Sequence, residues 1–305
     1  MRVLAADIGG SNTRLQILDR FGAVETLRIS TEGPSLSQAI KPHASSFVGL
    51  TGAVLAIAGP VLAQKAKLTN YHWQVDAASL SLALGCPVRL INDFEAAALG
   101  VSVLPQSATE HLSGPAPDPN GLAVVLGPGT GLGQALLLPG NPRHVHPTEG
   151  GHVDLAPNCP TQARIWSWLF EKHGHVSAER VLSGAGLLSL QHFFAKEMGE
   201  APLERPAQVS GSQTPSARAA LTHFVQFLGA HAGNMALALT PSGGVWIAGG
   251  IAPRLPINEL GLVAAFHNKG RLSPACAQTP LMLVLDSDLG LLGAAALARR
   301  LYGGV

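Results

Sequence analysis

Two segments of the chain repeat the order of a buried strand, a glycine-rich turn and a second strand, and this pattern constrains the fold most. The first segment has strands at residues 3–6 and 14–18 around a turn at 7–12. The second has strands at 122–126 and 132–138 around a turn at 127–131. Neighbouring glycines accept positive φ, so such a turn can present backbone N–H groups to an anion. The sequence therefore predicts two sheet domains, each with a turn that can bind phosphate.

Composition excludes several classes of protein. Hydrophobic residues make up 47% of the 305 residues and charged residues 13%, which allows a large core and does not indicate disorder. The formal net charge is +1 and there is no basic block. Nucleic acid and an anionic membrane surface are therefore not expected as partners.

Cysteine use and the N-terminal residues indicate the compartment. Cys86, Cys159 and Cys276 are far apart and form no CxxC pair, as is typical of a reducing environment. An acidic residue at position 7 comes too soon for the apolar region of a signal peptide. The longest apolar run, 54–63, is interrupted by Gly59 and Pro60 and is too short to span a bilayer. We expect a cytoplasmic protein without a membrane segment.

Strands and helices alternate along the rest of the chain. Further strands are predicted at 24–29, 53–58, 89–91, 243–248 and 281–285. Helices are predicted at 35–48, 77–84, 161–172, 177–182, 186–198, 215–239 and 289–301, with a helix starting at 95 and a surface loop at 199–214. The segment 107–121 is rich in Pro and Gly and is the best candidate for a domain boundary.

Asn92 and Asp93 lie where a predicted buried strand leads into a helix. The carboxyl ends of strands in open α/β sheets face the ligand site. A carboxylate there can accept a proton from a substrate hydroxyl, and the neighbouring amide can hold that hydroxyl. The alternative is that Asp93 serves only as the N-cap of the helix.

Known nucleotide and hydrolase motifs are absent. The chain contains no G-x-x-x-x-G-K-[ST], and Leu132 occupies the place of the third glycine of G-x-G-x-x-G. No G-x-S-x-G occurs either. Three glycine sites, at 9–10, 127–133 and 249–250, together still suggest a nucleotide held by loops.

Two further clusters carry polar side chains. Residues 149–154 place a carboxylate and an imidazole beside two glycines, a combination that can bind a polyol; metal binding by His144, His146, Glu149 and His152 is a weaker alternative without a known spacing. In residues 174–180, Ser177 is expected from the residues alone to cap a helix, with Glu179 in its first turn.

Six motifs, in the same order and over nearly the whole chain, resemble those of the bacterial glucokinase family. They lie at 7–15, 91–94, 129–133, 149–154, 174–184 and 243–250. Ser11 replaces the more usual Thr, and Pro128 stiffens the second turn. The Cys-rich zinc motif of the other bacterial sugar-kinase group is absent, so the chain resembles the zinc-free group.

The resemblance implies an α/β fold of the actin-like ATPase (ribonuclease H-like) type, with a cleft between two domains. Residues 1–103 and 285–305 would form the smaller domain and residues 104–284 the larger one. It also implies a homodimer.

The resemblance also assigns roles to individual residues. The hydroxyls of glucose would contact Asn92, Asp93, Glu149, His152 and Glu179, and Asp93 would accept the O6 proton. The phosphates of ATP would lie against Gly9, Gly10, Ser11 and Asn12 and against Gly129, Thr130 and Gly131, with Gly249 and Gly250 beside the adenosine. Asp7 would lie near Mg²⁺, with water between them.

The resulting hypothesis is an ATP-dependent glucokinase that makes glucose 6-phosphate. A kinase for another hexose, such as mannose or an N-acetyl amino sugar, is the nearest alternative, because the sequence does not show which hydroxyls are recognised. A sugar sensor that regulates transcription is less favoured. The first strand starts by Val3, which leaves no room for a helix-turn-helix before it.

Overall fold

The computed structural model describes residues 1–9, 12–31, 33–69 and 71–304. Gly10 and Ser11 of the predicted first phosphate turn lie outside this range. The chain forms two compact units. The first contains residues 1–105, 144–147 and 288–305, and the second contains residues 106–143 and 148–287.

The first unit is built on a five-stranded sheet with the order β3-β2-β1-β4-β8. Its elements are β1 (Arg2–Ile8), β2 (Asn12–Asp19), β3 (Ala23–Ser30), α1 (Leu36–Ile40), the 3-10 helix η1 (Lys41–Phe47), β4 (Gly52–Ile57), α2 (Ala77–Leu84), β8 (Val88–Asn92), α3 (Asp93–Val101) and α10 (Leu289–Tyr302). The same unit contains a separate three-stranded sheet of β5 (Val61–Leu62), β6 (Lys65–Lys67) and β7 (Gln74–Asp76).

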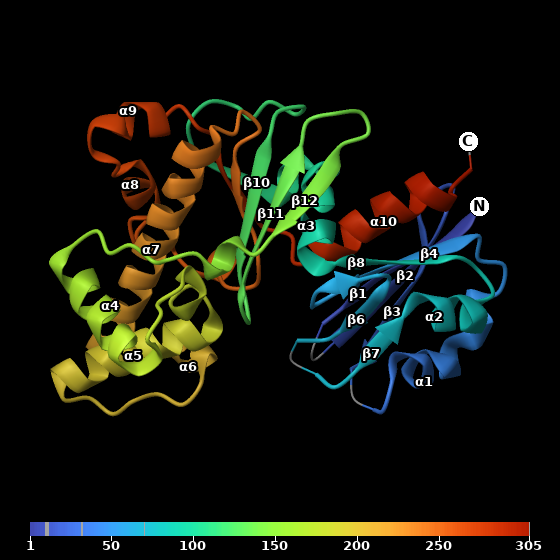
Figure 1. Ribbon diagram of the computed structural model, residues 1–305, viewed down its shortest axis with the longest axis horizontal. Helices are drawn as coiled ribbons and strands as arrows, with labels where there is room; N and C mark the ends of the chain where they lie inside the picture. The colour runs from blue at the N-terminus through green and yellow to red at the C-terminus, as the bar shows by residue number, and fades with distance from the viewer. Residues whose placement is uncertain (10–11, 32, 70, 305) are drawn as a thin grey trace. The chain divides into compact units, whose positions relative to one another are not determined.

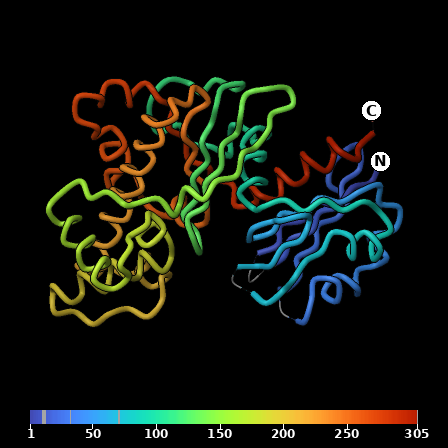
Figure 2. Tube along the Cα trace, in the orientation of Figure 1, coloured from blue at the N-terminus to red at the C-terminus, as the bar shows by residue number. Residues whose placement is uncertain are grey.

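Side chains of the first sheet alternate between two cores, as the period of a strand requires. In β1, Leu4 and Ala6 pack in the core that includes residues of α1 and α2. Val3 and Ala5 pack in the core that includes residues of α3 and α10. Figure 1 shows α1 and α2 on one side of this sheet and α10 on the other, and Figure 2 follows α10 back to the N-terminal strands.

The second unit has a six-stranded sheet with the order β12-β11-β10-β13-β14-β9. Its strands are β9 (Thr109–Ser113), β10 (Ala123–Pro128), β11 (Leu132–Leu138), β12 (His144–Thr148), β13 (Val245–Ile247) and β14 (Leu281–Val284). Its α-helices are α4 (Pro160–His173), α5 (Gly184–Met198), α6 (Pro206–Gly211), α7 (Pro215–Leu239), α8 (Leu262–His267) and α9 (Ser273–Cys276). Its 3-10 helices are η2 (Gln106–Ala108), η3 (Gly150–His152), η4 (Ala178–Arg180), η5 (Ala252–Arg254) and η6 (Gly270–Leu272).

The two sheets repeat one arrangement of strands. In the first, β1 pairs antiparallel with β2 and parallel with β4. In the second, β10 pairs antiparallel with β11 and parallel with β13. Both strand–turn–strand segments predicted from the glycines are therefore hairpins at the same place in equivalent sheets.

Helix α7 lies at the centre of the core of the second unit. Phe224, Phe227 and Leu228 are buried there together with Leu190 of α5 and Leu262 of α8. The predicted bounds of α7, residues 215–239, are confirmed. In the part of the chain that the structure describes, no helix is both long and apolar enough to cross a bilayer.

Three predictions of secondary structure are wrong. The segment 199–214 contains the helix α6, which Pro206 starts and the Gln208 side chain supports by accepting from the Arg205 N–H at 2.9 Å. The expected helix at 177–182 is only the 3-10 turn η4. The expected helix at 35–48 is α1 followed by η1, with non-helical backbone at His43.

We predict that the close approach of α10 to α3 depends on Gly293. A Cβ at this position would overlap the Ala96 carbonyl oxygen. Gly293→Ala should therefore lower the free energy of unfolding by about 1–3 kcal/mol, the usual effect of overpacking, as measured by urea denaturation. Gly211→Ala is the matched control because its Cβ would meet open space. Equal stability of the two variants would contradict the prediction.

Candidate active site

Asn92 and Asp93 lie at the carboxyl end of β8, where the chain enters α3. The Asn92 Oδ1 accepts from the backbone N–H groups of Phe94 at 2.8 Å and Glu95 at 3.3 Å. Its Nδ2 donates to the Gly59 carbonyl at 3.1 Å. Asn92 is thus the N-cap, and the alternative that Asp93 has this role is wrong. Asp93 is the first residue of the helix.

The carboxyl group of Asp93 is suited to proton transfer near neutral pH. Burial raises its pKa to about 6, and the negative charge of Asp7 acts in the same direction. A hydrogen bond from the Phe94 N–H to Asp93 Oδ1, at 3.0 Å, partly offsets this. The group remains mostly ionised at pH 7 and can accept a proton from a neighbouring hydroxyl.

Asp7, on β1, is the second carboxylate of this region. Burial raises its pKa; the charge of Arg14 lowers it and that of Asp288 raises it. Arg14 lies opposite Asp7 in the hairpin register and donates through Nη1 to Asp288 Oδ1. A Cβ on Gly290 would lie 3.5 Å from the Asp7 carboxyl carbon.

No role was predicted for Arg14, Asp288 or Gly290 from the sequence. Hairpin register could have placed Arg14 opposite Asp7, since the turn between the two strands is short. No local pattern relates Asp288 and Gly290 to β1, because α10 returns to the first sheet from the far end of the chain.

Asp7 fits a role beside Mg²⁺. The charge of Asp288 raises the pKa of Asp7, and the charge of Asp7 raises that of Asp93. Arg14 is the cation that lowers the pKa of Asp7. Asp7 and Asp93 are buried carboxylates, and Mg²⁺ prefers carboxylate and water oxygens, so Asp7 could hold the ion with water completing the coordination.

Of the predicted first phosphate turn, Gly9 and Asn12 are described. The Gly9 carbonyl accepts from the Thr31 hydroxyl at 3.0 Å. Asn12 begins β2 and pairs with Ser30 of β3.

In the second unit, Glu179 contacts the predicted second phosphate turn. Its Oε2 accepts from the backbone N–H of Leu132 at 2.8 Å. A Cβ on Gly131 would lie 2.5 Å from the same oxygen. The turn itself is closed by a hydrogen bond from the Gly129 N–H to the Gly131 carbonyl, at 2.8 Å. Thr130, between them, is exposed.

Gly249 lies against the same turn. It follows β13 with φ +83°, and a Cβ there would be 2.6 Å from the Pro128 carbonyl oxygen. A Cβ on Gly250 would meet nothing within 4 Å. The structure thus places Gly249 beside Gly127 and Pro128, which lead into the predicted second phosphate turn.

Glu149 precedes the 3-10 turn η3, and His152 is the last residue of that turn. The Nε2 of His152 lies 3.9 Å from Glu179 Oε1, which is an electrostatic contact rather than a hydrogen bond. Glu149 is exposed, and its carbonyl accepts from the His152 N–H at 2.9 Å. Gly150 packs on the side chain of Gln134, a buried residue that the sequence analysis did not single out.

Two alternatives from the sequence find no support. Ser177 precedes η4, but its side chain makes no capping hydrogen bond. Among the residues with described positions, no three His, Cys, Asp or Glu side chains are grouped so that they could hold a metal ion, and this covers His144, His146, Glu149 and His152.

Comparisons with known proteins show the family to which the chain belongs. The family model described as Glucokinase matches residues 4–301. The chain is 35% identical to the glucokinase of Nostoc punctiforme over 345 aligned positions, which cover 98% of this chain and 99% of that protein. A crystal structure of glucokinase from an Antarctic psychrotroph aligns with a TM-score of 0.85 and 32% identity, covering 98% of this chain and 99% of the other.

A more distant structure has the same fold. The ROK family glucokinase of Streptomyces griseus, solved in complex with glucose and AMPPNP, aligns with a TM-score of 0.67 and 19% identity over 98% of this chain and 100% of the other. These matches confirm the predicted α/β fold of the actin-like ATPase type. Together with the family model and the full-length relative, they establish that the chain belongs to the glucokinase family.

Proposed function

We propose that this protein transfers the γ-phosphoryl group of ATP to O6 of glucose and releases glucose 6-phosphate and ADP. The observation that carries the proposal is the carboxyl group of Asp93, at the end of β8, with a pKa of about 6. Membership in the glucokinase family supports the choice of substrate and phosphoryl donor.

In the proposed mechanism, Asp93 accepts the proton of the O6 hydroxyl as that oxygen attacks phosphorus. A base with a pKa just below the working pH is ionised and still basic enough to take this proton. Asn92 and Asp93 of the first unit, with Glu149, His152 and Glu179 of the second, would hold the sugar hydroxyls. Phosphoryl transfer asks the protein mainly to align the reactants and to offset charge.

The glycine turns would bind the triphosphate through backbone N–H groups. In this proposal, residues 9–12 form one turn and residues 129–131 the other, while Gly249 and Gly250 contact the adenosine. Asp7 would hold Mg²⁺ through water, and the bound ion would offset negative charge on the phosphate oxygens.

The domain limits and the assembly are also proposals that follow from the family resemblance, and the location is a proposal that follows from cysteine use. We propose domains of residues 1–103 with 285–305 and of residues 104–284, a homodimer, and a cytoplasmic protein. The low number of cysteines, three in 305 residues and far apart, supports the location.

A panel of hexoses tests the proposed activity. ADP formation from MgATP should be fastest with glucose, low with mannose and N-acetylglucosamine, and close to zero without sugar, because a site that hydrogen-bonds hydroxyls rejects epimers that leave polar groups unpaired. The measurement is a coupled ADP assay. If only another hexose supports turnover, that hexose is the substrate, and the proposed role of Asp93 is unchanged. Sugar binding without any ADP would favour the sensor.

Asp93→Asn should lower kcat by about a hundredfold or more and change the KM for glucose little, because the amide keeps the shape and loses the base. Steady-state kinetics would measure both constants. Glu95→Gln is the matched control: it removes a half-buried carboxylate two residues further along α3 and should keep near-normal turnover. An Asp93→Asn enzyme as fast as this control would overturn the assignment.

The pH dependence of kcat/KM follows from the raised pKa of Asp93, about 6. Protonated Asp93 cannot accept the O6 proton, so kcat/KM should fall about tenfold per pH unit below this value and level off above it. Circular dichroism at each pH would separate this loss from acid unfolding. A folded enzyme whose kcat/KM is constant from pH 7 to pH 5 would contradict the prediction.

A further inference from the structure

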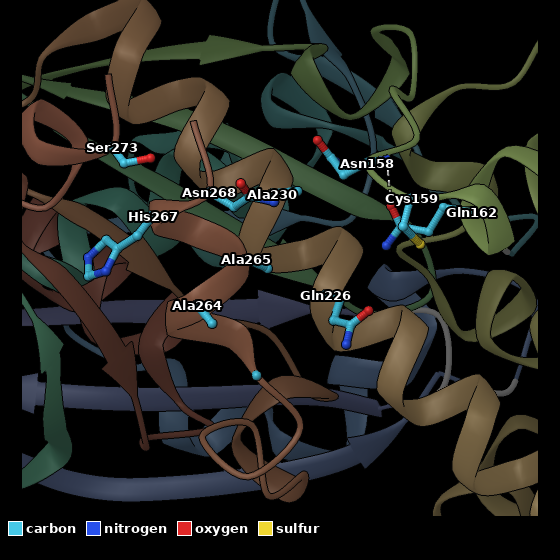
Figure 3. A pocket seen from close by; sticks show the side chains of 11 residues that line it. Asn158, Cys159, Gln162, Gln226, Ala230, Ala264, Ala265, His267, Asn268 and Ser273 are labelled. Carbon is cyan, nitrogen blue, oxygen red and sulfur yellow. Dashed lines mark hydrogen bonds between the residues drawn. The ribbon is translucent and has the colours of Figure 1, made fainter. Parts of the chain in front are cut away.

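The second unit contains a cavity of about 620 Å³ that includes none of the residues predicted for the sugar or ATP. Figure 3 shows side chains of α4, α7 and α8 around it. The lining residues used below are Asn158, Cys159 and Gln162 before and within the first turn of α4, Gln226 and Ala230 of α7, and Asn268 after α8.

Gln162 is the buried polar group of this cavity. The residue is only 2% exposed, and its Oε1 accepts from the Asn158 N–H at 2.8 Å, as the dashed line in Figure 3 marks. No acceptor for its Nε2 is found among the residues that the structure describes. This nitrogen is accessible from the cavity, and a ligand atom there could accept a hydrogen bond from it.

The N-terminus of α4 opens at the same place. This helix has 14 residues, and the side chain of its N-cap, Cys159, makes no capping hydrogen bond. The first N–H groups of a helix lack partners within the helix and carry a partial positive charge. Together with Gln162, this end of the cavity offers donors to an anion.

The charges around the cavity point the same way. None of its lining residues is acidic. Lys269 follows Asn268, and its Nζ donates to the Ala230 carbonyl at 2.8 Å and to Asn234 Oδ1 at 2.6 Å.

Other lining residues carry groups that match hydroxyls. The amides of Gln226 and Asn268 line the cavity, and each can both donate and accept, as a hydroxyl does. We propose that the cavity binds a phosphate monoester of a polyhydroxylated molecule, with its phosphate at the start of α4 and its hydroxyls against Gln226 and Asn268. The probe is glucose 6-phosphate, the product of the proposed reaction. Only this choice of probe rests on the proposed function.

Equilibrium dialysis of labelled glucose 6-phosphate against the full chain tests the proposal. Saturating glucose and the absence of ATP keep the sugar site filled, so the expected result is one equivalent bound in the cavity. Gln162→Glu keeps the oxygen that accepts from Asn158, removes the donor and adds negative charge; it should weaken binding at least about tenfold. Asn268→Ala should weaken it about three- to tenfold.

Gln213→Glu is the matched control, since Gln213 is exposed and does not line the cavity; it should bind as the unchanged protein does. The proposal is overturned if no glucose 6-phosphate binds at saturating glucose, or if folded Gln162→Glu binds normally. It is also overturned if inorganic phosphate or excess glucose competes as well as glucose 6-phosphate. Kinase activity, measured on the same preparation, tests the proposed function separately.

Discussion

Burial of carboxylates at the carboxyl ends of β1 and β8 is the constraint on which the chemistry of the first unit depends. The two strands flank β4, and burial raises the pKa of both Asp7 and Asp93. Keeping such groups ionised at neutral pH costs folding free energy, and this cost decreases as the pH falls through their raised pKa values. These are the two positions proposed for the catalytic base and for the residue beside Mg²⁺, and active sites commonly contain such carboxylates with raised pKa values.

In the second unit, the carboxylate of Glu179 contacts the glycine turn after β10. Glu179 accepts from the Leu132 N–H and fills the space that a side chain at position 131 would need. Glu179, which the family resemblance assigns to the sugar, therefore also fixes the backbone of the turn at 129–131, which the resemblance assigns to the phosphates. Since a hydrogen bond to a charged group is stronger than a neutral one, neutralising Glu179 would affect the turn as well as the sugar.

The sequence predicted those parts of the site whose signal is local. Glycines at the ends of buried strands placed both hairpins, and Asp93 stands next to its strand, so β8 and α3 were expected. The alternative that Asp93 is the N-cap names the wrong neighbour because Asn and Asp are about equally good N-caps. Only the hydrogen bonds from the Phe94 and Glu95 N–H groups to Asn92 decide between them. The pairing of Arg14 with Asp288 spans 274 positions, and no local pattern contains it.

The packing of α10 against α3 explains how Asp288, far from Asp7 in the sequence, can act on Asp7. Gly293 lets it approach the Ala96 carbonyl of α3, and Gly100 of α3 leaves room for Leu289. The same helix brings Gly290 to Asp7 and is preceded by Asp288, which raises the pKa of Asp7. Asp93 is the first residue of the helix that α10 packs against. The packing of these two helices therefore also determines the electrostatics of Asp7 and Asp93. A substitution that separates the helices would change the pKa of Asp93 as well as the packing of the core.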